Sequence, residues 1–376
     1  MPMCVCPTFH EYMLNLFSTD HSSATMLPQN SSLHFLLIFC PLIFAFPGHG
    51  QTNSQTSGMD ASLRTLTIFH TNDLRGRLMP GTYYDEANRG GMARIVHLLR
   101  DLDAANVLIL DSGDAMGPEL LSQFGEGRLM VDLMNVAKYS AMTVGNHEFA
   151  YGLEILGNRA AQADFPLLAA NIIHKETNQL LLQSHILVDK AGLRILVVGL
   201  VSPRIQKLIN PIKMAGIAIN DPATTLQEIL QQTHEDRADL TIALVHMTAS
   251  EVEALASAFP AVALFVAGGF DPSEQKDGNL HLMQTAAGNR VVSTPNNGAY
   301  VGRIDIRPGD ATAFAATLIQ VGDNLPPDAN AKERIEQHQI TFQQSRNQPL
   351  GTIPTAIEDQ HVFVARLMRQ DRKSVV

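Results

Sequence analysis

The chain has 376 residues, of which 45% are hydrophobic and 17% are charged, the ordinary composition of a globular protein. Its 26 Gly and 19 Pro exclude collagen-like and low-complexity classes. A mean hydropathy of +0.02 and a single short apolar run exclude a polytopic membrane protein. The formal net charge of −10 disfavours binding to a phosphate backbone, so no nucleic-acid polymer is expected as a partner.

Residues 1–50 are predicted to form a leader with a signal peptide. No Lys or Arg precedes Arg64, and residues 35–46 (FLLIFCPLIFAF) form an apolar run of signal-peptide length that is too short to span a bilayer. Small residues at 48–50 offer a cleavage site. We therefore predict export to the periplasm or the medium, with membrane contact only through the cleaved signal. Because no Lys or Arg precedes the run, a disordered, wrongly assigned leader stays open as the alternative. Met26 is a candidate for the true start, which would make residues 1–25 a mis-assigned extension.

Residues 51–63 are predicted to be a polar tether, and the chain's cysteines all lie before it. The three cysteines are Cys4, Cys6 and Cys40. A mature chain that begins near Gln51 would contain no thiol. Its metal sites would then use carboxylate, amide and imidazole groups alone.

The body of the chain, from residue 64 onward, has the pattern of an α/β protein. Short apolar runs alternate with segments of helical periodicity. The expected strands are 66–69, 107–110, 141–144, 186–189, 194–200, 240–245 and 262–266. The expected helices are 91–102, 127–136, 153–163, 223–233 and 249–258. After Gly268 we expect short antiparallel strands at 280–285, 291–293, 301–306 and 314–320.

The pattern predicts one large domain, followed by a helix and the beginning of another domain. Residues 64–325 are assigned to the large domain, and 326–346, entered through two prolines, to a polar linker helix. A strand candidate at 350–353 then suggests that 347–376 is the start of a truncated C-terminal domain.

Polar residues gather at the points where the predicted strands end. Asp73, Asp114, Asn146, His147 and His246 all lie at or just after such ends. In open α/β sheets, sites form at the carboxyl ends of strands. Two carboxylates, an amide and imidazoles suit Mn, Zn or Fe. Each fragment alone is weak, because an Asp after a strand is often a helix cap; their common placement favours a metal site.

The order of these fragments resembles that of the secreted 5'-nucleotidases, which are calcineurin-like metallophosphoesterases. The resemblance runs from about residue 64 to 310, and its most specific block is TVGNHEFAYG at 143–152. It implies an α/β fold, a four-layer αββα sandwich with two β-sheets between helices. It also implies two metal ions and a separate C-terminal domain that grips the nucleotide base, reached through the linker helix and almost absent from this chain.

The resemblance also implies a role for each strand-end residue. Asp73 matches the first-site carboxylate, and Asp114 matches the carboxylate that bridges both metals. Asn146 matches a second-site ligand that approaches the substrate phosphate, and His246 matches a second-site histidine. His147 matches the catalytic histidine beside the phosphate in the transition state.

The chain departs from the family pattern at four positions. Arg75 stands where the opening motif Asp-x-His has its histidine, and residues 269–272 read Gly-Phe-Asp-Pro in place of Gly-His-x-His. Ala150 stands where the family has the aspartate that orients the catalytic histidine. Three metal-binding imidazoles are therefore missing. Asp271 or His281 is left open as a replacement ligand.

These departures predict one divalent ion rather than two. Two protein ligands remain at the first site, whereas Asp114, Asn146 and His246 remain at the second. Arg75 would compete with a first metal ion and, with Asn146, could hold a substrate phosphate. Losing even an outer partner typically costs about 10–100-fold in metal affinity or activity.

Two functions stay open on the sequence alone. The first is a weakened 5'-nucleotidase-like phosphoesterase, in which a metal-activated water hydrolyses a small phosphate ester or nucleotide. The second is a catalytically inactive relative that acts as an anion-binding or interaction protein. The sequence predicts no oligomeric state.

Overall fold

The computed structural model describes residues 64–83, 85–234, 237–271, 279–307 and 314–347. The predicted leader and tether, and all but the first residue of the predicted segment 347–376, lie outside these residues. Among the described helices, none combines the length and apolarity needed to cross a membrane.

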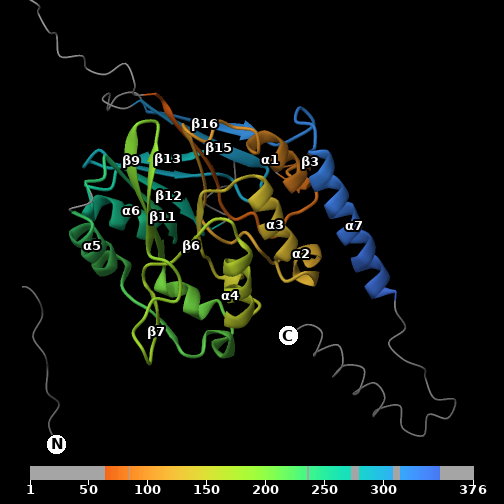
Figure 1. The fold of residues 1–376 in the computed structure, drawn as a ribbon, viewed down its shortest axis with the longest axis horizontal. Coiled ribbons are helices and arrows are strands. Elements are labelled where there is room, and N and C mark those ends of the chain that lie inside the picture. The colour runs from red at the N-terminus through yellow and green to blue at the C-terminus, as the bar shows by residue number, and fades with distance from the viewer. Residues whose placement is uncertain (1–63, 84, 235–236, 272–278, 308–313, 348–376) are drawn as a thin grey trace, which may run out of the picture. The chain divides into compact units, whose positions relative to one another are not determined.

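The first of two large sheets has the strand order β16-β15-β1-β4-β5-β6 (Figure 1). Strands β1, β4, β5 and β6 are parallel, while β15 runs antiparallel to β1 and β16 antiparallel to β15. Their bounds are β1 (Leu66–Thr71), β4 (Val107–Asp111), β5 (Ala141–Thr143), β6 (Leu167–Leu168), β15 (Tyr300–Ile306) and β16 (Phe314–Gln320).

The second sheet has the order β13-β14-β12-β11-β9-β8. Its strands are β8 (His185–Lys190), β9 (Leu193–Val201), β11 (Leu240–His246), β12 (Leu264–Gly268), β13 (His281–Gln284) and β14 (Arg290–Ser293). Strand β14 corrects the expectation of antiparallel pairing after Gly268. It is antiparallel to β13 but parallel to β12, so it extends the parallel centre of the sheet.

The two sheets pack face to face through a layer of buried aliphatic side chains. Ile68 and Leu110 from the first sheet share this layer with Val197, Leu244 and Val266 from the second, each fully buried. The central strands are therefore buried on both faces, and such strands have nearly continuous apolar sequences. That is why the apolar runs predicted them well.

Helices cover the outer face of each sheet. On the first sheet lie α1 (Met92–Leu99), α2 (Leu120–Phe124), α3 (Arg128–Val136), α4 (Leu153–Gln162) and α7 (Ala329–Arg346). On the second lie α5 (Pro222–Gln232) and α6 (Ala249–Ala258). The predicted four-layer αββα sandwich is confirmed.

Several short elements were not predicted. They are α2, β6, β2 (Gly81–Tyr83), β3 (Glu86–Arg89), β7 (Ile172–His174), β10 (Ile217–Ile219) and the 3₁₀ turns η1 (His147–Phe149), η2 (Pro203–Lys207) and η3 (Pro211–Met214). Segments of two to five residues carry too little periodicity to be recognised in a sequence.

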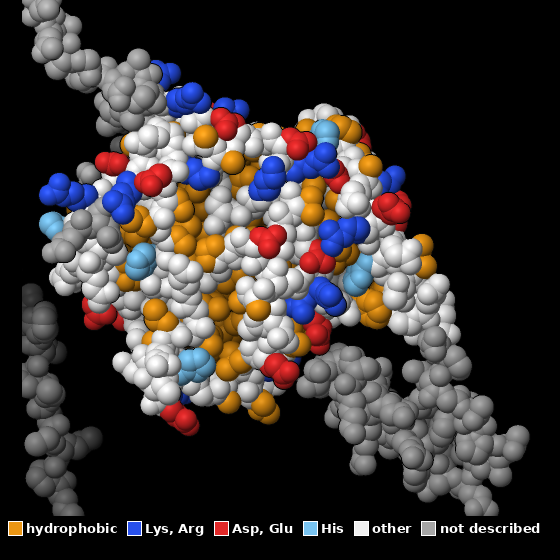
Figure 2. Space-filling view, in the orientation of Figure 1, with side chains coloured by type: hydrophobic (Ala, Val, Ile, Leu, Met, Phe, Trp, Pro, Cys, Tyr) orange, Lys and Arg blue, Asp and Glu red, His pale blue; other side chains and the backbone are white. Residues whose placement is uncertain are grey.

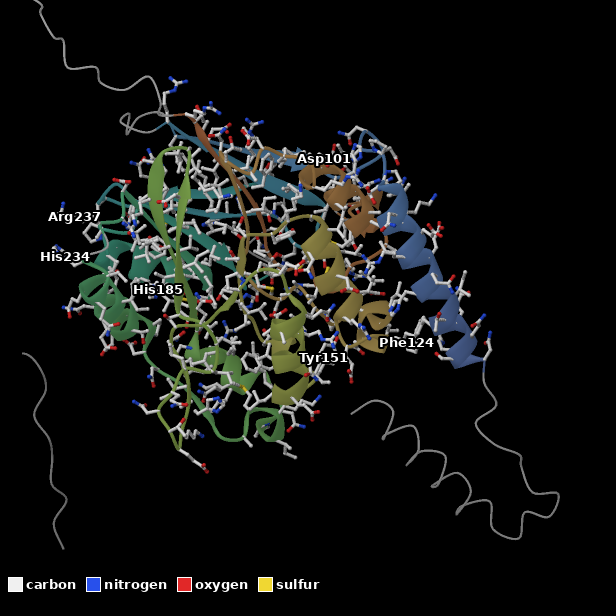
Figure 3. The ribbon with its side chains drawn as sticks, viewed as in Figure 1. Asp101, Phe124, Tyr151, His185, His234 and Arg237 are labelled. Carbon is white, nitrogen blue, oxygen red and sulfur yellow. The ribbon has the colours of Figure 1, made fainter. Side chains whose placement is uncertain are left out.

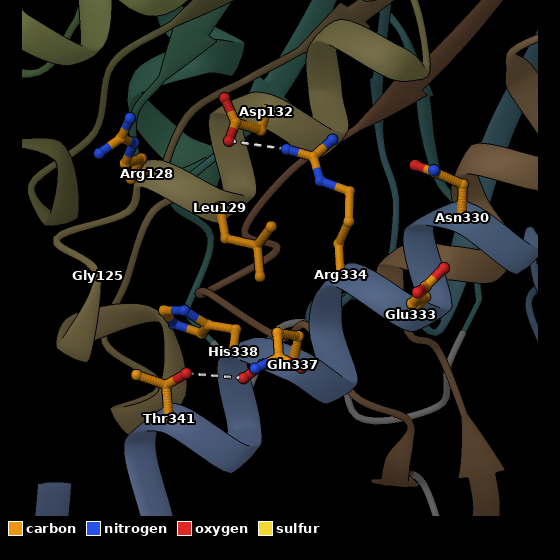
Figure 4. Close-up of a pocket in the computed structure, with 10 residues that line it drawn as sticks. All are labelled: Gly125, Arg128, Leu129, Asp132, Asn330, Glu333, Arg334, Gln337, His338 and Thr341. Carbon is orange, nitrogen blue, oxygen red and sulfur yellow. Dashed lines mark hydrogen bonds and ion pairs between the residues drawn. The ribbon is translucent and has the colours of Figure 1, made fainter. Parts of the chain in front are cut away.

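The predicted linker helix, α7, packs against α1 and α2. Its Ala331 and Ile335 are buried in the core on the outer face of the first sheet. Figure 4 shows Arg334 of α7 reaching Asp132 of α3, at 2.8 Å. Phe124, labelled in Figure 3, lies with its ring centroid 5.4 Å from that of His338. The helix is thus part of the sandwich.

Charged side chains are mixed on the face that Figure 2 shows. Lys and Arg alternate with Asp and Glu over this face and do not gather into a patch of one sign.

Candidate metal centre

The two sheets bring three predicted ligands together at the carboxyl ends of their strands. Asp73 follows β1, Asp114 follows β4, and His246 is the last residue of β11. All three are buried, and each offers a ligand atom that lies within 4.8 Å of the other two. The site therefore joins the first sheet to the second.

A cavity of about 180 Å³ contains these ligands and the other predicted site residues. Its lining includes all six predicted residues: Asp73, Arg75, Asp114, Asn146, His147 and His246. Asp271, one of the two possible replacement ligands, also lines the cavity. His281 does not, and its ring packs edge-on against Phe270 with the centroids 4.9 Å apart.

Asp114 lies at the centre of the cluster. Its Oδ2 is 3.5 Å from Nε2 of His246 and 3.7 Å from Nε2 of His147. Its Oδ1 accepts a hydrogen bond from the main-chain N–H of His147 at 2.8 Å. Burial raises the pKa of the Asp114 carboxyl, but the two imidazoles outweigh burial and hold that pKa below its usual value. Asp114 is thus kept ionised, as a metal ligand must be.

His246 is oriented by a main-chain carbonyl. Its Nδ1 donates to the carbonyl oxygen of Ser112 at 2.8 Å, so Nε2 is the nitrogen that faces Asp114. Burial lowers the pKa of His246, but the carboxylates of Asp114 and Asp73 raise it above its usual value. A proton and a metal ion therefore compete for the same nitrogen, Nε2.

The carboxylate of Asp73 is held on both of its oxygens. Oδ2 accepts from the main-chain N–H of Gly269 and from Nδ2 of Asn72, each at 3.0 Å. Oδ1 lies 3.5 Å from Nη2 of Arg75. Asn72 is itself fixed, because its Oδ1 accepts from both the N–H and the hydroxyl of Thr294. Arg75 thus brings a permanent positive charge to the side of the cavity where Asp73 lies.

His147 has no side-chain partner at position 150, where the resemblance places an orienting aspartate. Ala150 offers only its main-chain carbonyl, which accepts from Lys213 Nζ. Among the described residues, the one carboxylate within ion-pair distance of the His147 ring is Asp114. The ring is 22% exposed, and it faces the cavity from η1.

A glycine allows the two halves of the site to approach. A Cβ on Gly145 would lie 2.2 Å from Oδ1 of Asp114 and 2.7 Å from Nε2 of His246. Any larger residue would push these two side chains apart. The sequence marks this position only as the residue before Asn146.

Three contributors to the site were missed by the sequence analysis. Glu148 lies fully buried beside Asp114 and accepts main-chain hydrogen bonds from its loop. Ser202 donates to Glu251 at 2.7 Å, and both line the cavity on the side of the second sheet. Glu148 stands within the specific block at 143–152, but nothing in the sequence shows that its partners are main-chain groups.

The donor set fits a divalent cation. Three carboxylates of the site, Asp73, Asp114 and Glu148, are buried. In the described part of the chain, the one buried base in contact with them is His246. Arg75 is 28% exposed, so water screens its charge. Buried carboxylates are costly unless cations or hydrogen bonds compensate them. Two carboxylates and one imidazole suit a borderline-hard divalent ion.

Comparisons with known proteins support this assignment. No family model matches the chain. The chain is 30% identical over 299 residues to the 5'-nucleotidase of Vibrio cholerae, covering 72% of this chain and 53% of that protein. It is 28% identical over 328 residues to the protein UshA of Escherichia coli, with 79% and 57% covered. The chain spans little more than half the length of these relatives.

Solved structures share the fold. The 5'-nucleotidase precursor of Thermus thermophilus matches with a TM-score of 0.65 and 24% identity, over 76% of this chain and 60% of that chain. The calcineurin-like phosphoesterase YfkN of Bacillus subtilis matches with a TM-score of 0.62 and 22% identity, over 75% and 99%. The chain thus has the fold of the calcineurin-like phosphoesterases. In sequence, the chain is similar to 5'-nucleotidases, and the match covers their N-terminal catalytic domain.

Proposed function

We propose that the protein is an exported, metal-dependent phosphoesterase of the 5'-nucleotidase type. Its substrate is a small phosphate ester, and the names of its relatives favour a nucleotide. The observation that carries this proposal is the convergence of Asp73, Asp114 and His246 within 4.8 Å, in a cavity that Arg75 and His147 also line.

One divalent ion, Mn, Zn or Fe, is held by Asp73, Asp114 and His246, with the amide oxygen of Asn146 available in the same cavity. When bound, such an ion supplies Lewis-acid charge to a phosphate oxygen and lowers the pKa of a water. The hydrogen bond from His246 Nδ1 to the Ser112 carbonyl fixes the ring for this ligation. We propose one ion rather than the family's two because three metal-binding imidazoles are missing.

The chain's own side chains bind and orient the phosphate. Arg75 has a buried Nε with no hydrogen-bond partner among the described residues, and its guanidinium is planar and suits a phosphate. Asn146 and His147 lie on the same short segment and line the same cavity. We assign Arg75 and Asn146 to the phosphate oxygens, and the catalytic role beside them to His147.

A second candidate is a catalytically inactive anion-binding protein. Two observations favour it: Arg75 lies 3.5 Å from Asp73, and Ala150 leaves the His147 ring without a second carboxylate. In that case Arg75 and Asn146 bind an anion, and the protein does not hydrolyse it.

The proposal is tested by metal content. After incubation with Mn²⁺ or Zn²⁺ and removal of free metal, native mass spectrometry of the wild-type protein should find about one ion per chain. His246→Ala should lose it, because Nε2 is a ligand that no neighbour replaces. His281→Ala, a histidine outside the cavity, is the matched control and should keep its ion.

The same samples separate the two candidates. Release of phosphate from a nucleoside monophosphate by the wild type, and its loss in His246→Ala, would support the phosphoesterase. Metal binding without phosphate release would favour the inactive anion-binding protein. If no sample holds an ion, the metal-dependent proposal is wrong.

A further inference from the structure

Glu148 is a fully buried carboxylate that accepts four main-chain hydrogen bonds. Its Oε2 accepts from the N–H groups of Asp114 at 2.9 Å and Gly145 at 2.7 Å. Its Oε1 accepts from the N–H groups of Ala115 at 2.8 Å and Met116 at 3.0 Å. One side chain therefore joins the loop after β4, which carries Asp114, to the loop after β5.

The loop after β4 needs such support. Asp114 has a φ of 56°, in the left-handed region that non-glycine residues rarely adopt. Gly113, just before it, has a φ of 88°. The main-chain N–H groups of residues 114, 115 and 116 all point at Glu148, which holds the chain in this conformation.

The contacts call for a carboxylate and no other group. Each of the four partners is a donor, so both oxygens act as acceptors. A glutamine of the same shape would turn an NH₂ group toward two N–H groups and leave them unsatisfied. Buried unsatisfied donors are costly, so the substitution would move the loops apart.

We propose that Glu148 is the positioning residue of the metal centre: by fixing both loops, it sets the place of Asp114 and of the main chain before Asn146. This inference rests on the proposed function, because it assumes that the cluster binds a metal ion. Glu148 touches neither the ion nor the substrate, and acts through the residues that do. Without it, the approach of Asp114 to His246, at 3.5 Å, is no longer enforced.

The alternative is that Glu148 only stabilises the fold, and Asn171 offers a matched control. Asn171 is also fully buried. Its Nδ2 donates to the carbonyls of Val201 and Asn220 at 2.8 and 3.0 Å, and its Oδ1 accepts from the N–H of Val201 at 3.0 Å. It joins the end of β9 to the loop at Asn220, but it does not line the cavity.

The experiment measures Mn²⁺ affinity and thermal stability in the same full-length variants. Free Mn²⁺ is followed by electron paramagnetic resonance, at a temperature where circular dichroism shows each variant to be folded. Glu148→Gln should bind Mn²⁺ about 10–100-fold more weakly than the wild type. Asn171→Ala should also unfold at a lower temperature, yet bind Mn²⁺ within about twofold of the wild type.

Two outcomes would overturn the inference. One is wild-type Mn²⁺ affinity in Glu148→Gln; the other is an equal loss of affinity in Asn171→Ala. If Glu148→Gln does not fold, Glu148→Asp replaces it, because aspartate keeps the carboxylate but is shorter by one methylene. Wild-type Mn²⁺ affinity in Glu148→Asp would also overturn the inference. A wild-type protein that binds no Mn²⁺ would instead contradict the proposed function itself.

Discussion

His70 is an ionisable side chain buried between the two sheets, outside the proposed metal cluster. It is 1% exposed, and neither ring nitrogen has a hydrogen-bond partner among the described residues. Its ring lies over Gly302 of the neighbouring strand β15. Burial lowers the pKa of His70 from 6.5 to about 3. Between these pH values the unfolded chain binds a proton that the folded chain does not, so stability falls as the pH drops below about 6.5.

Replacing His70 with leucine should remove this acid sensitivity. When the pH falls from 7 to 5, His70 should lower the unfolding free energy of the wild type by about 2 kcal/mol. The unfolding free energy of His70→Leu should therefore fall by about 2 kcal/mol less over the same pH range. Urea unfolding at the two pH values measures the difference. His97→Gln, at an exposed histidine on α1, is the control and should keep the wild-type pH dependence. Equal pH dependence in His70→Leu and wild type would show that folding does not lower the pKa of His70.

At the scale of single residues, the sequence identified the cavity's polar side chains but not what holds them. Asp73, Asp114 and His246 follow strand ends and belong to a recognisable pattern, so their convergence could be predicted. Their supports could not, because these are main-chain groups such as the Ser112 carbonyl and the N–H of Gly269. A hydrogen bond to the main chain leaves no trace in residue identity. The ligand roles of these side chains stay predictions until a metal ion is measured.

At the scale of elements, prediction succeeded where most positions of an element are buried and therefore apolar. The central strands are apolar throughout because both of their faces are covered. Helix α7 has few buried apolar positions: Ala331 and Ile335 are its fully buried residues, and most of the helix is exposed. A helix with so few core positions resembles a free linker in sequence. Its packing on α1 and α2 follows from tertiary contacts that the pattern does not show.

Two isoleucines of α7 test whether the helix belongs to the core. Ile335 is 2% exposed, whereas Ile340 is 46% exposed on the same helix. Ile335→Ala leaves a cavity in the core and should lower the unfolding free energy by about 2–4 kcal/mol. Ile340→Ala should change it by less than about 0.5 kcal/mol. Urea denaturation of both variants measures the two values, and equal small losses would mean that α7 is only attached to the sandwich.

At the scale of the whole described domain, the proposed metal site links the two sheets. Asp73 and Asp114 belong to loops of the first sheet, and His246 ends a strand of the second. An ion that binds all three is bound by the folded chain and not by the unfolded one. It should therefore add about 2.7 kcal/mol of stability at a free concentration of 100 times its Kd. His246→Ala removes the ligand from the second sheet and should show no such gain.

Leu244 separates the metal effect from the packing of the sheets. It is fully buried between them, two residues before His246 on β11, and it offers no ligand. Leu244→Ala should cost about 2–5 kcal/mol through the cavity that it leaves. Because the ligands are intact, Mn²⁺ should still stabilise this variant by the wild-type amount, measured as the shift of the urea midpoint with and without Mn²⁺. If Mn²⁺ stabilises His246→Ala as much as Leu244→Ala, the ion binds elsewhere and the two sheets are held together by packing alone.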